Sequence, residues 1–262
     1  MNRPISASYD PVESVQLSHC EHAPPVSCGR KRMPFGAFAL ASVVCGAVVA
    51  VSFTWDAAVQ QWVQTRVSAG SLQIAGFIGR WGDFGGVAAF AVVVWAVARW
   101  CGWSRVQYWI HVMLLSAVLS GLSANVVRVA CGRTRPNSGL VEGWHGPAVA
   151  LDFSKASHRF HAFPSAHTAV VAGFFSPVWV AVSRRRRPQR WYGALASGAV
   201  VGILLMAGAR VWSGAHHVSD VLAAVLLGSL WGISLAQLRP LARWRKRSAA
   251  ECRVFWRKLS TR

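Results

Sequence analysis

The 262-residue sequence has few charged residues and very few acidic ones. Only 14% of its residues are charged, and Asp and Glu together number 9. Soluble domains usually carry about 25% charged residues, so the composition argues against an ordinary soluble enzyme. The scarcity of carboxylates also leaves no cluster that could hold a magnesium ion, and we therefore expect neither a metal nor another cofactor.

Hydrophobic residues make up 53% of the chain and concentrate in long runs. The first run, Gly36–Trp55, contains no charge, and its 20 residues would form a helix about 30 Å long, enough to cross the hydrocarbon core. Five further runs are Phe84–Ala98, Val106–Val127, Thr168–Ser183, Trp191–Ala209 and Val221–Leu238. Because backbone polar groups must be satisfied inside lipid, the sequence predicts an all-α bundle of six transmembrane helices within residues 35–238.

Basic residues indicate how this bundle is oriented. Of the 28 Lys and Arg residues, 20 lie before the first run, between the second and third, between the fourth and fifth, or after the sixth. These segments share one side of the bundle, which the positive-inside rule assigns to the cytoplasm. We therefore expect both termini in the cytoplasm, with residues 239–262 as a basic tail, and the amphipathic segment 57–79 on the outer membrane face. Since topology accounts for the basic residues, we expect no binding of nucleic acid.

The six cysteines are scattered, and only Cys131 is expected near the outer side, so the sequence predicts no structural disulfide. His19, Cys20, His22 and Cys28 lie close together, but their spacing matches no standard zinc pattern. We expect the polar residues 1–34, which show no cleavable signal peptide, to form a flexible tail.

Three polar patches fall on the outer side of the predicted bundle. Each alone has a structural explanation, such as a membrane-anchoring arginine or a surface His/Asp pair. Charged residues at a membrane boundary are nevertheless costly and tend to be functional, so three patches on one face predict a functional site. The patches are Arg128 with Arg135-Pro136, then Pro164-Ser165-Ala166-His167, and then Arg210 with His216 and Asp220.

Five of these residues suit the binding of a phosphate group. The side chains of Arg128, Arg135 and Arg210 can donate paired hydrogen bonds to phosphate oxygens. Pro164 favours the first turn of a helix, which places Ser165 and Ala166 at an amino end where free N–H groups bind anions.

The other three residues suit the transfer of that phosphate. His216 and Asp220 are four residues apart, so Asp220 is expected to accept the Nδ1 proton of His216 and leave Nε2 free as a nucleophile. His167 is a second imidazole that can donate and accept a proton.

The patches resemble the motifs of the type 2 phosphatidic acid phosphatase (PAP2) superfamily, which includes vanadium haloperoxidases and glucose-6-phosphatase. That family's pattern is Lys-x6-Arg-Pro, Pro-Ser-Gly-His and Ser-Arg-x5-His-x3-Asp, and every spacing fits this chain. The resemblance implies a metal-independent phosphatase in which His216 is the nucleophile, Asp220 orients it and His167 is the acid and base. It also implies that Arg128, Arg135, Arg210, Ser165 and the N–H of Ala166 hold the phosphate.

Three residues depart from the family pattern. Arg128 replaces Lys, Ala166 replaces Gly and Ala209 replaces Ser. Arg128 keeps the positive charge of lysine but changes the shape of the side chain. Ala166 adds a methyl group near the anion site, and Ala209 lacks a hydroxyl beside Arg210. None of them removes a group that forms or breaks a bond.

We therefore predict an inner-membrane enzyme that hydrolyses a lipid phosphomonoester or diphosphate at the outer face through a phosphohistidine. Candidate substrates are undecaprenyl diphosphate, phosphatidylglycerophosphate, phosphatidic acid and a lipid A phosphate. One alternative is a lipid phosphotransferase that uses the same phosphohistidine, and another is a non-catalytic protein that binds lipid phosphates. A haloperoxidase fits less well, because those enzymes are mostly soluble. The oligomeric state stays open.

Overall fold

The computed structural model describes residues 35–151, 157–183 and 190–238. The chain divides into two units, Met1–Leu40 and Ala41–Arg262, which are considered separately. In the first unit, the described residues 35–40 begin helix α1. The His/Cys group near the N-terminus and the tails 1–34 and 239–262 lie outside the described residues.

The described residues are helical, apart from loops and one isolated β-bridge between Arg133 and Trp144. The long helices are α1 (Phe35–Ser52), α4 (Phe84–Trp100), α5 (Ser104–Cys131), α9 (Arg190–Trp212) and α10 (Val218–Gln237). Shorter helices are α2 (Asp56–Arg66), α3 (Ala69–Trp81), α6 (Gly146–Ala150), α7 (Ala166–Phe175) and α8 (Pro177–Ser183). Single 3-10 turns are η1 (Phe53–Trp55), η2 (Pro136–Ser138) and η3 (Ser157–Phe160).

Five helical segments are long and apolar enough to cross a membrane: Val43–Arg66, Ser104–Cys131, Ala166–Ser183, Arg190–Trp212 and Val218–Gln237. A sixth arises if α3 and α4, which meet at a bend of 60°, count as one broken span. The all-α bundle predicted from the sequence is therefore confirmed. The predicted run Phe84–Ala98 corresponds to α4, and the amphipathic segment 57–79 forms α2 and most of α3.

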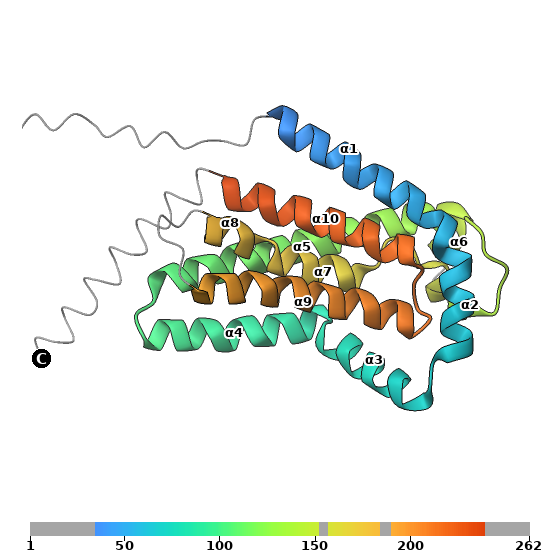
Figure 1. The fold of residues 1–262 in the computed structure, drawn as a ribbon, viewed down its shortest axis with the longest axis horizontal. Helices are drawn as coiled ribbons and strands as arrows, with labels where there is room; N and C mark the ends of the chain where they lie inside the picture. Colours follow the sequence, from blue (N-terminus) through green and yellow to red (C-terminus); the bar gives the residue numbers. More distant parts are fainter. Residues whose placement is uncertain (1–34, 152–156, 184–189, 239–262) are drawn as a thin grey trace, which may run out of the picture. The chain divides into compact units, whose positions relative to one another are not determined.

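The centre of the bundle is formed by α5, α7 and α10, with α9 and α4 packed alongside (Figure 1). Small residues let these helices approach closely. A Cβ atom added at Gly228 of α10 would lie 2.5 Å from the carbonyl oxygen of Ala169 in α7. One added at Gly173 of α7 would lie 2.9 Å from the carbonyl oxygen of Ser116 in α5. This packing, typical of membrane helices, holds the amino ends of α7 and α10 in fixed positions.

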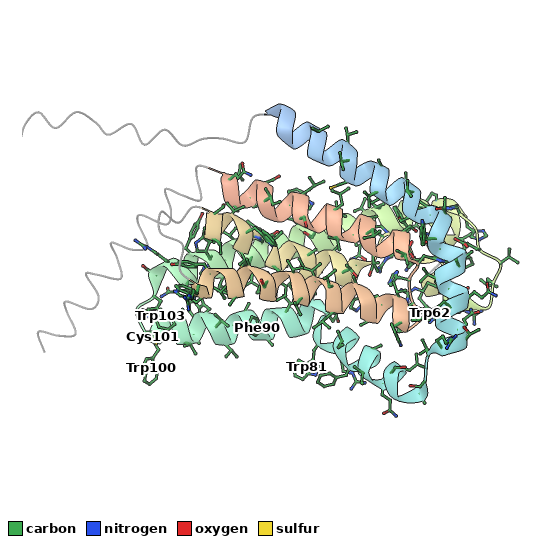
Figure 2. The ribbon with its side chains drawn as sticks, viewed as in Figure 1. Trp62, Trp81, Phe90, Trp100, Cys101 and Trp103 are labelled. Carbon is green, nitrogen blue, oxygen red and sulfur yellow. The ribbon has the colours of Figure 1, made fainter. Side chains whose placement is uncertain are left out.

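Exposed tryptophans mark both ends of the bundle. Figure 2 places Trp100 and Trp103 at the α4–α5 turn, and Trp62 of α2 at the opposite end. Trp100 is 84% exposed and Trp62 is 49% exposed. Tryptophan favours the two membrane–water interfaces, so this distribution agrees with a bundle that crosses the bilayer.

Candidate functional site

The three polar patches meet at the end of the bundle where α2 and α3 lie (Figure 1). Backbone hydrogen bonds connect them: Ser165 N–H donates to the carbonyl oxygen of Asp220 at 3.1 Å, and Ala162 N–H donates to that of Arg133 at 3.1 Å. Gly132 ends α5 with a φ of 59°, and a Cβ there would lie 2.3 Å from the carbonyl oxygen of Gly146. Glycine is therefore required at the turn that leads from α5 into the site.

The three predicted phosphate-binding arginines come from different elements but share one electrostatic environment. Arg128 lies in the last turn of α5, Arg135 follows that helix, and Arg210 lies near the end of α9. The charges of Arg135 and Arg210 both act on Arg128. Burial lowers the pKa of Arg135, while the carboxylate of Asp220 opposes this effect.

These guanidinium groups have hydrogen-bond donors without a partner among the residues that the structure describes. The Nε of each of the three arginines is buried and has no partner within the described part of the chain, and neither has Nη2 of Arg128. Buried donors are normally satisfied, so these N–H groups are available to donate hydrogen bonds to an anion such as phosphate.

The amino end of α7 supplies the second predicted anion-binding element. Ser165 is fully buried and is the N-cap, while Ala166 is the first residue of the helix. The Ser165 hydroxyl accepts a hydrogen bond from Thr168 Oγ1 at 3.0 Å. Pro164 was expected in the first helical turn, but Ser165 is an extended N-cap and α7 begins at Ala166, two residues after the proline.

Ala166 fits its position without strain. No described residue other than glycine has a positive φ, so this position does not require glycine's conformational freedom. Its methyl group packs against a cluster of small buried residues, Ala124, Ala169 and Ala224.

His216 lies between α9 and α10 and is completely buried. Its Nδ1 lies 2.7 Å from the carbonyl oxygen of Ala162 and 3.7 Å from Oδ2 of Asp220. The nearest acceptor is therefore a backbone carbonyl that the sequence did not indicate, and Asp220 adds a negative charge beside it. Burial lowers the pKa of His216 to about 3, although Asp220 acts to raise it.

The second nitrogen of His216 has no partner in the described part of the chain. Nε2 is buried and makes no hydrogen bond to the residues that the structure describes. With Nδ1 donating its proton to Ala162, the neutral ring carries its lone pair on Nε2. The charges of Arg210 and Arg135 reach the ring, so this lone pair lies beside the arginines.

His167 lies in the first turn of α7, on the same electrostatic network. The charges of Arg210, Asp83, Arg128 and Arg135 all act on its imidazole. Its Nε2 lies 3.7 Å from Oδ1 of Asp83, which also accepts a hydrogen bond from Phe84 N–H at the start of α4. A second imidazole thus lies near the arginines, on the side of the site next to α4.

Sequence reasoning missed a buried arginine. Arg133 is 1% exposed and lies among four acceptors, which together with it are named the Arg133 cluster: Asp56, Glu142, Ser219 and Asp220. The Asp56 side chain is 3% exposed and pairs with Arg133. The signal in the sequence was Asp56 itself, an acidic residue directly after a long apolar run in a chain with 9 acidic residues.

Two members of the Arg133 cluster, Asp56 and Glu142, also form a group of potential metal ligands with His217, among the described residues. Ligand atoms of Asp56, Glu142 and His217 lie within 4.8 Å of one another. Nη2 of Arg133 already lies 2.8 Å from Asp56 Oδ2 and also contacts Glu142. The guanidinium supplies the positive charge that these carboxylates would otherwise take from a cation.

Comparison with known proteins identifies relatives. Residues 109–244 match the PAP2 superfamily. The lipid A 1-phosphatases of Rhizobium etli and Rhizobium johnstonii are 30% and 33% identical to this chain over 130 residues, which is 49% of this chain and 50% and 47% of theirs. The chain thus spans about half the length of these curated relatives.

A solved structure has the same fold. The transmembrane PAP2 type phosphatidylglycerolphosphate phosphatase from Bacillus subtilis aligns with a TM-score of 0.55 and 19% identity. The alignment covers 76% of this chain and 92% of that one.

Proposed function

Because the chain belongs to the PAP2 superfamily, we propose that it is a membrane-embedded lipid phosphatase that acts through a phosphohistidine. The observation that carries this proposal is the buried Nε2 of His216, which has no hydrogen-bond partner among the described residues and lies within the electrostatic reach of Arg210 and Arg135. A protein that only binds phosphate would need the arginines but no free nucleophile.

The proposed reaction has two steps. In the first, Nε2 of His216 attacks phosphorus, the P–N bond forms and the bond to the lipid oxygen breaks. His167 donates a proton to the leaving oxygen. In the second, His167 accepts a proton from water, which attacks phosphorus, breaks the P–N bond and releases phosphate.

The surrounding groups stabilise the charge that develops on the phosphoryl oxygens. Arg128, Arg135 and Arg210 would bind these oxygens, with Ser165 and the N–H of Ala166 at the amino end of α7. We expect no requirement for a metal, because fixed guanidinium groups perform the charge neutralisation that a divalent cation performs in other phosphoryl-transfer sites.

The distribution of basic residues supports an active site on the outer face of the inner membrane, with both termini in the cytoplasm. There a lipid head group would lie level with the site. The names of the Rhizobium relatives make a lipid A-type 1-phosphate the first substrate to test. Undecaprenyl diphosphate, phosphatidylglycerophosphate and phosphatidic acid complete the panel.

The test is phosphate release by detergent-purified protein from this panel, in the presence of EDTA. We expect release from at least one lipid, and a loss of about 10⁴-fold or more in His216→Ala. The matched control is His158→Ala, which changes an exposed histidine and should keep wild-type activity.

Two results would contradict the hydrolase proposal. Lipid binding without release from any substrate would favour a binding protein. Release only after addition of a lipid alcohol, with the phosphate found on that alcohol, would favour a phosphotransferase. Loss of activity in EDTA, restored by a divalent cation, would contradict metal independence alone.

A further inference from the structure

We propose that Arg133 and Asp56 are positioning residues that hold Asp220 and the start of α10 in place, and through them the nucleophile His216; this inference rests on the proposed function. Neither residue contributes to phosphate binding in this proposal. They hold the carboxylate of Asp220, which lies beside the His216 ring, in a fixed position.

Arg133 connects two carboxylates that come from distant parts of the chain. Its Nη1 donates to Asp220 Oδ1 at 2.7 Å and to Ser219 Oγ at 2.7 Å. Its Nη2 donates to Asp56 Oδ2 at 2.8 Å and also contacts Glu142. One planar guanidinium therefore fixes the distance between Asp56 at the start of α2 and Asp220 in the first turn of α10.

Asp56 also binds the amino end of α10 directly. Its Oδ1 accepts a hydrogen bond from the backbone N–H of Ser219 at 2.9 Å, and its Oδ2 accepts one from the Ser219 hydroxyl at 2.5 Å. The first N–H groups of a helix have no partner within the helix, so a carboxylate from α2 caps α10 from outside. This cap holds the turn that carries Asp220, four residues after His216.

The other carboxylate oxygen of Asp220 faces the nucleophile. Oδ2 accepts the backbone N–H of His217 at 2.7 Å and lies 3.7 Å from Nδ1 of His216. Because Arg133 holds Oδ1, the carboxylate cannot rotate without breaking that contact. The position of the His216 ring thus depends on a chain of contacts that begins at Asp56.

Arg133 itself is held rigidly and stays charged. Its guanidinium carbon lies 5.1 Å from the ring centroid of Phe53 and 5.1 Å from that of Trp144. Such contacts stabilise a buried cation. Burial acts to lower the pKa of Arg133, but Asp220, Asp56 and Glu142 raise it above its ordinary value.

Arg133 differs in its surroundings from the phosphate-binding arginines. Both of its Nη groups are taken by side chains of the protein, which leaves only Nε without a partner among the described residues. Loss of its planar geometry should therefore slow the chemical step without weakening the hold on phosphate.

The experiment compares Arg133→Lys with wild-type protein. A lysine ammonium keeps the charge but has no planar fork that donates to Asp220 from one nitrogen and to Asp56 from another. We expect kcat to fall by about 10- to 100-fold, the loss that follows displacement of a reacting group by about 1 Å. The KM for the lipid and the inhibition constant of inorganic phosphate should stay within about 3-fold of wild type.

Asp56→Asn provides a second variant of nearly the same shape, in case Arg133→Lys does not fold. It should also lower kcat at unchanged KM, and Asp56→Glu should restore part of the rate. Arg66→Lys, an exposed arginine on the same helix α2, is the matched control and should behave as wild type. Rates of phosphohistidine formation in a single turnover, expressed per folded molecule, separate slower chemistry from a smaller folded fraction.

Wild-type kcat in Arg133→Lys, or in Asp56→Asn if only that variant folds, would overturn the inference while leaving the phosphatase proposal intact. So would a loss that appears equally in KM and in phosphate inhibition, because that would place these residues in phosphate binding. A wild-type protein that transfers no phosphate would overturn both proposals.

Discussion

The buried imidazole of His216 makes the folded protein sensitive to acid. Burial lowers the pKa of this group to about 3, against an ordinary value of 6.5, even though Asp220 acts in the opposite direction. Between these two values the unfolded chain binds a proton that the folded protein does not bind. The contribution of His216 to the free energy of unfolding is therefore fully present above pH 6.5 and is lost as the pH falls toward 3.

The size of the effect follows from the pKa difference. At about pH 5 the unfolded chain gains about 2 kcal/mol from protonation, since each pH unit below the unfolded pKa is worth about 1.4 kcal/mol. For a chain of this length, 1 kcal/mol moves the melting temperature by about 2–4 °C, so the expected shift is about 4–8 °C.

His216→Asn isolates this contribution. Asparagine keeps an N–H group that can reach the carbonyl oxygen of Ala162, but it does not titrate. Thermal unfolding in detergent, followed by tryptophan fluorescence at about pH 8 and about pH 5, should show a larger drop in wild type than in the variant, by about 4–8 °C.

His158→Asn is the control for this measurement. It makes the same substitution at an exposed histidine outside the proposed site. An equal drop in wild type and His216→Asn would refute the reasoning, because the ring would then not be held neutral by burial.

Three further predictions concern single contacts. Ser165→Ala should lower kcat/KM for phosphate release by about 10- to 100-fold, the value of one hydrogen bond to a charged group. Asp83→Asn should lower kcat by about 3- to 10-fold, since it removes the carboxylate that lies 3.7 Å from His167 Nε2. Gly228→Ala should cost about 1–3 kcal/mol in thermal unfolding, because its new Cβ would meet backbone atoms of α7. The control for Gly228→Ala is Gly198→Ala, whose new Cβ would have nothing within 4 Å and which should be neutral or stabilising.

The helices were predictable because their signal is local. A run of apolar residues as long as the bilayer is thick indicates a span by itself, and Val106–Val127 lies inside α5 as expected. The bend between α3 and α4 was not predictable in this way. At this bend Gly82 lies against Met206 of α9, a long-range contact that the residue pattern around position 82 does not reveal.

The sequence predicted the residues that line the site but not the residues that orient His216. Arg128, Arg135, Arg210 and His216 carry recognisable spacing, and the structure brings them into one electrostatic environment. The contacts that orient His216 are made by residues without a local pattern. Ala162 accepts a hydrogen bond from His216 through its backbone carbonyl, and a side-chain motif cannot predict such a contact. Asp56 accepts a hydrogen bond from Ser219, which is 163 residues away in the sequence.

The long-range contacts of Arg133 have a consequence for biogenesis. Arg133 is separated by 77 residues from Asp56 and by 87 from Asp220, and Asp56 reaches Ser219 across 163 residues. During synthesis the first carboxylate emerges long before the arginine, and the second emerges only with α10. The Arg133 cluster therefore cannot form before α10 has joined the bundle, and until then Arg133 and Asp56 lack their partners Asp220 and Ser219. His216 and Asp220 lie at the start of α10, so the proposed catalytic site is completed only when that helix packs into the bundle.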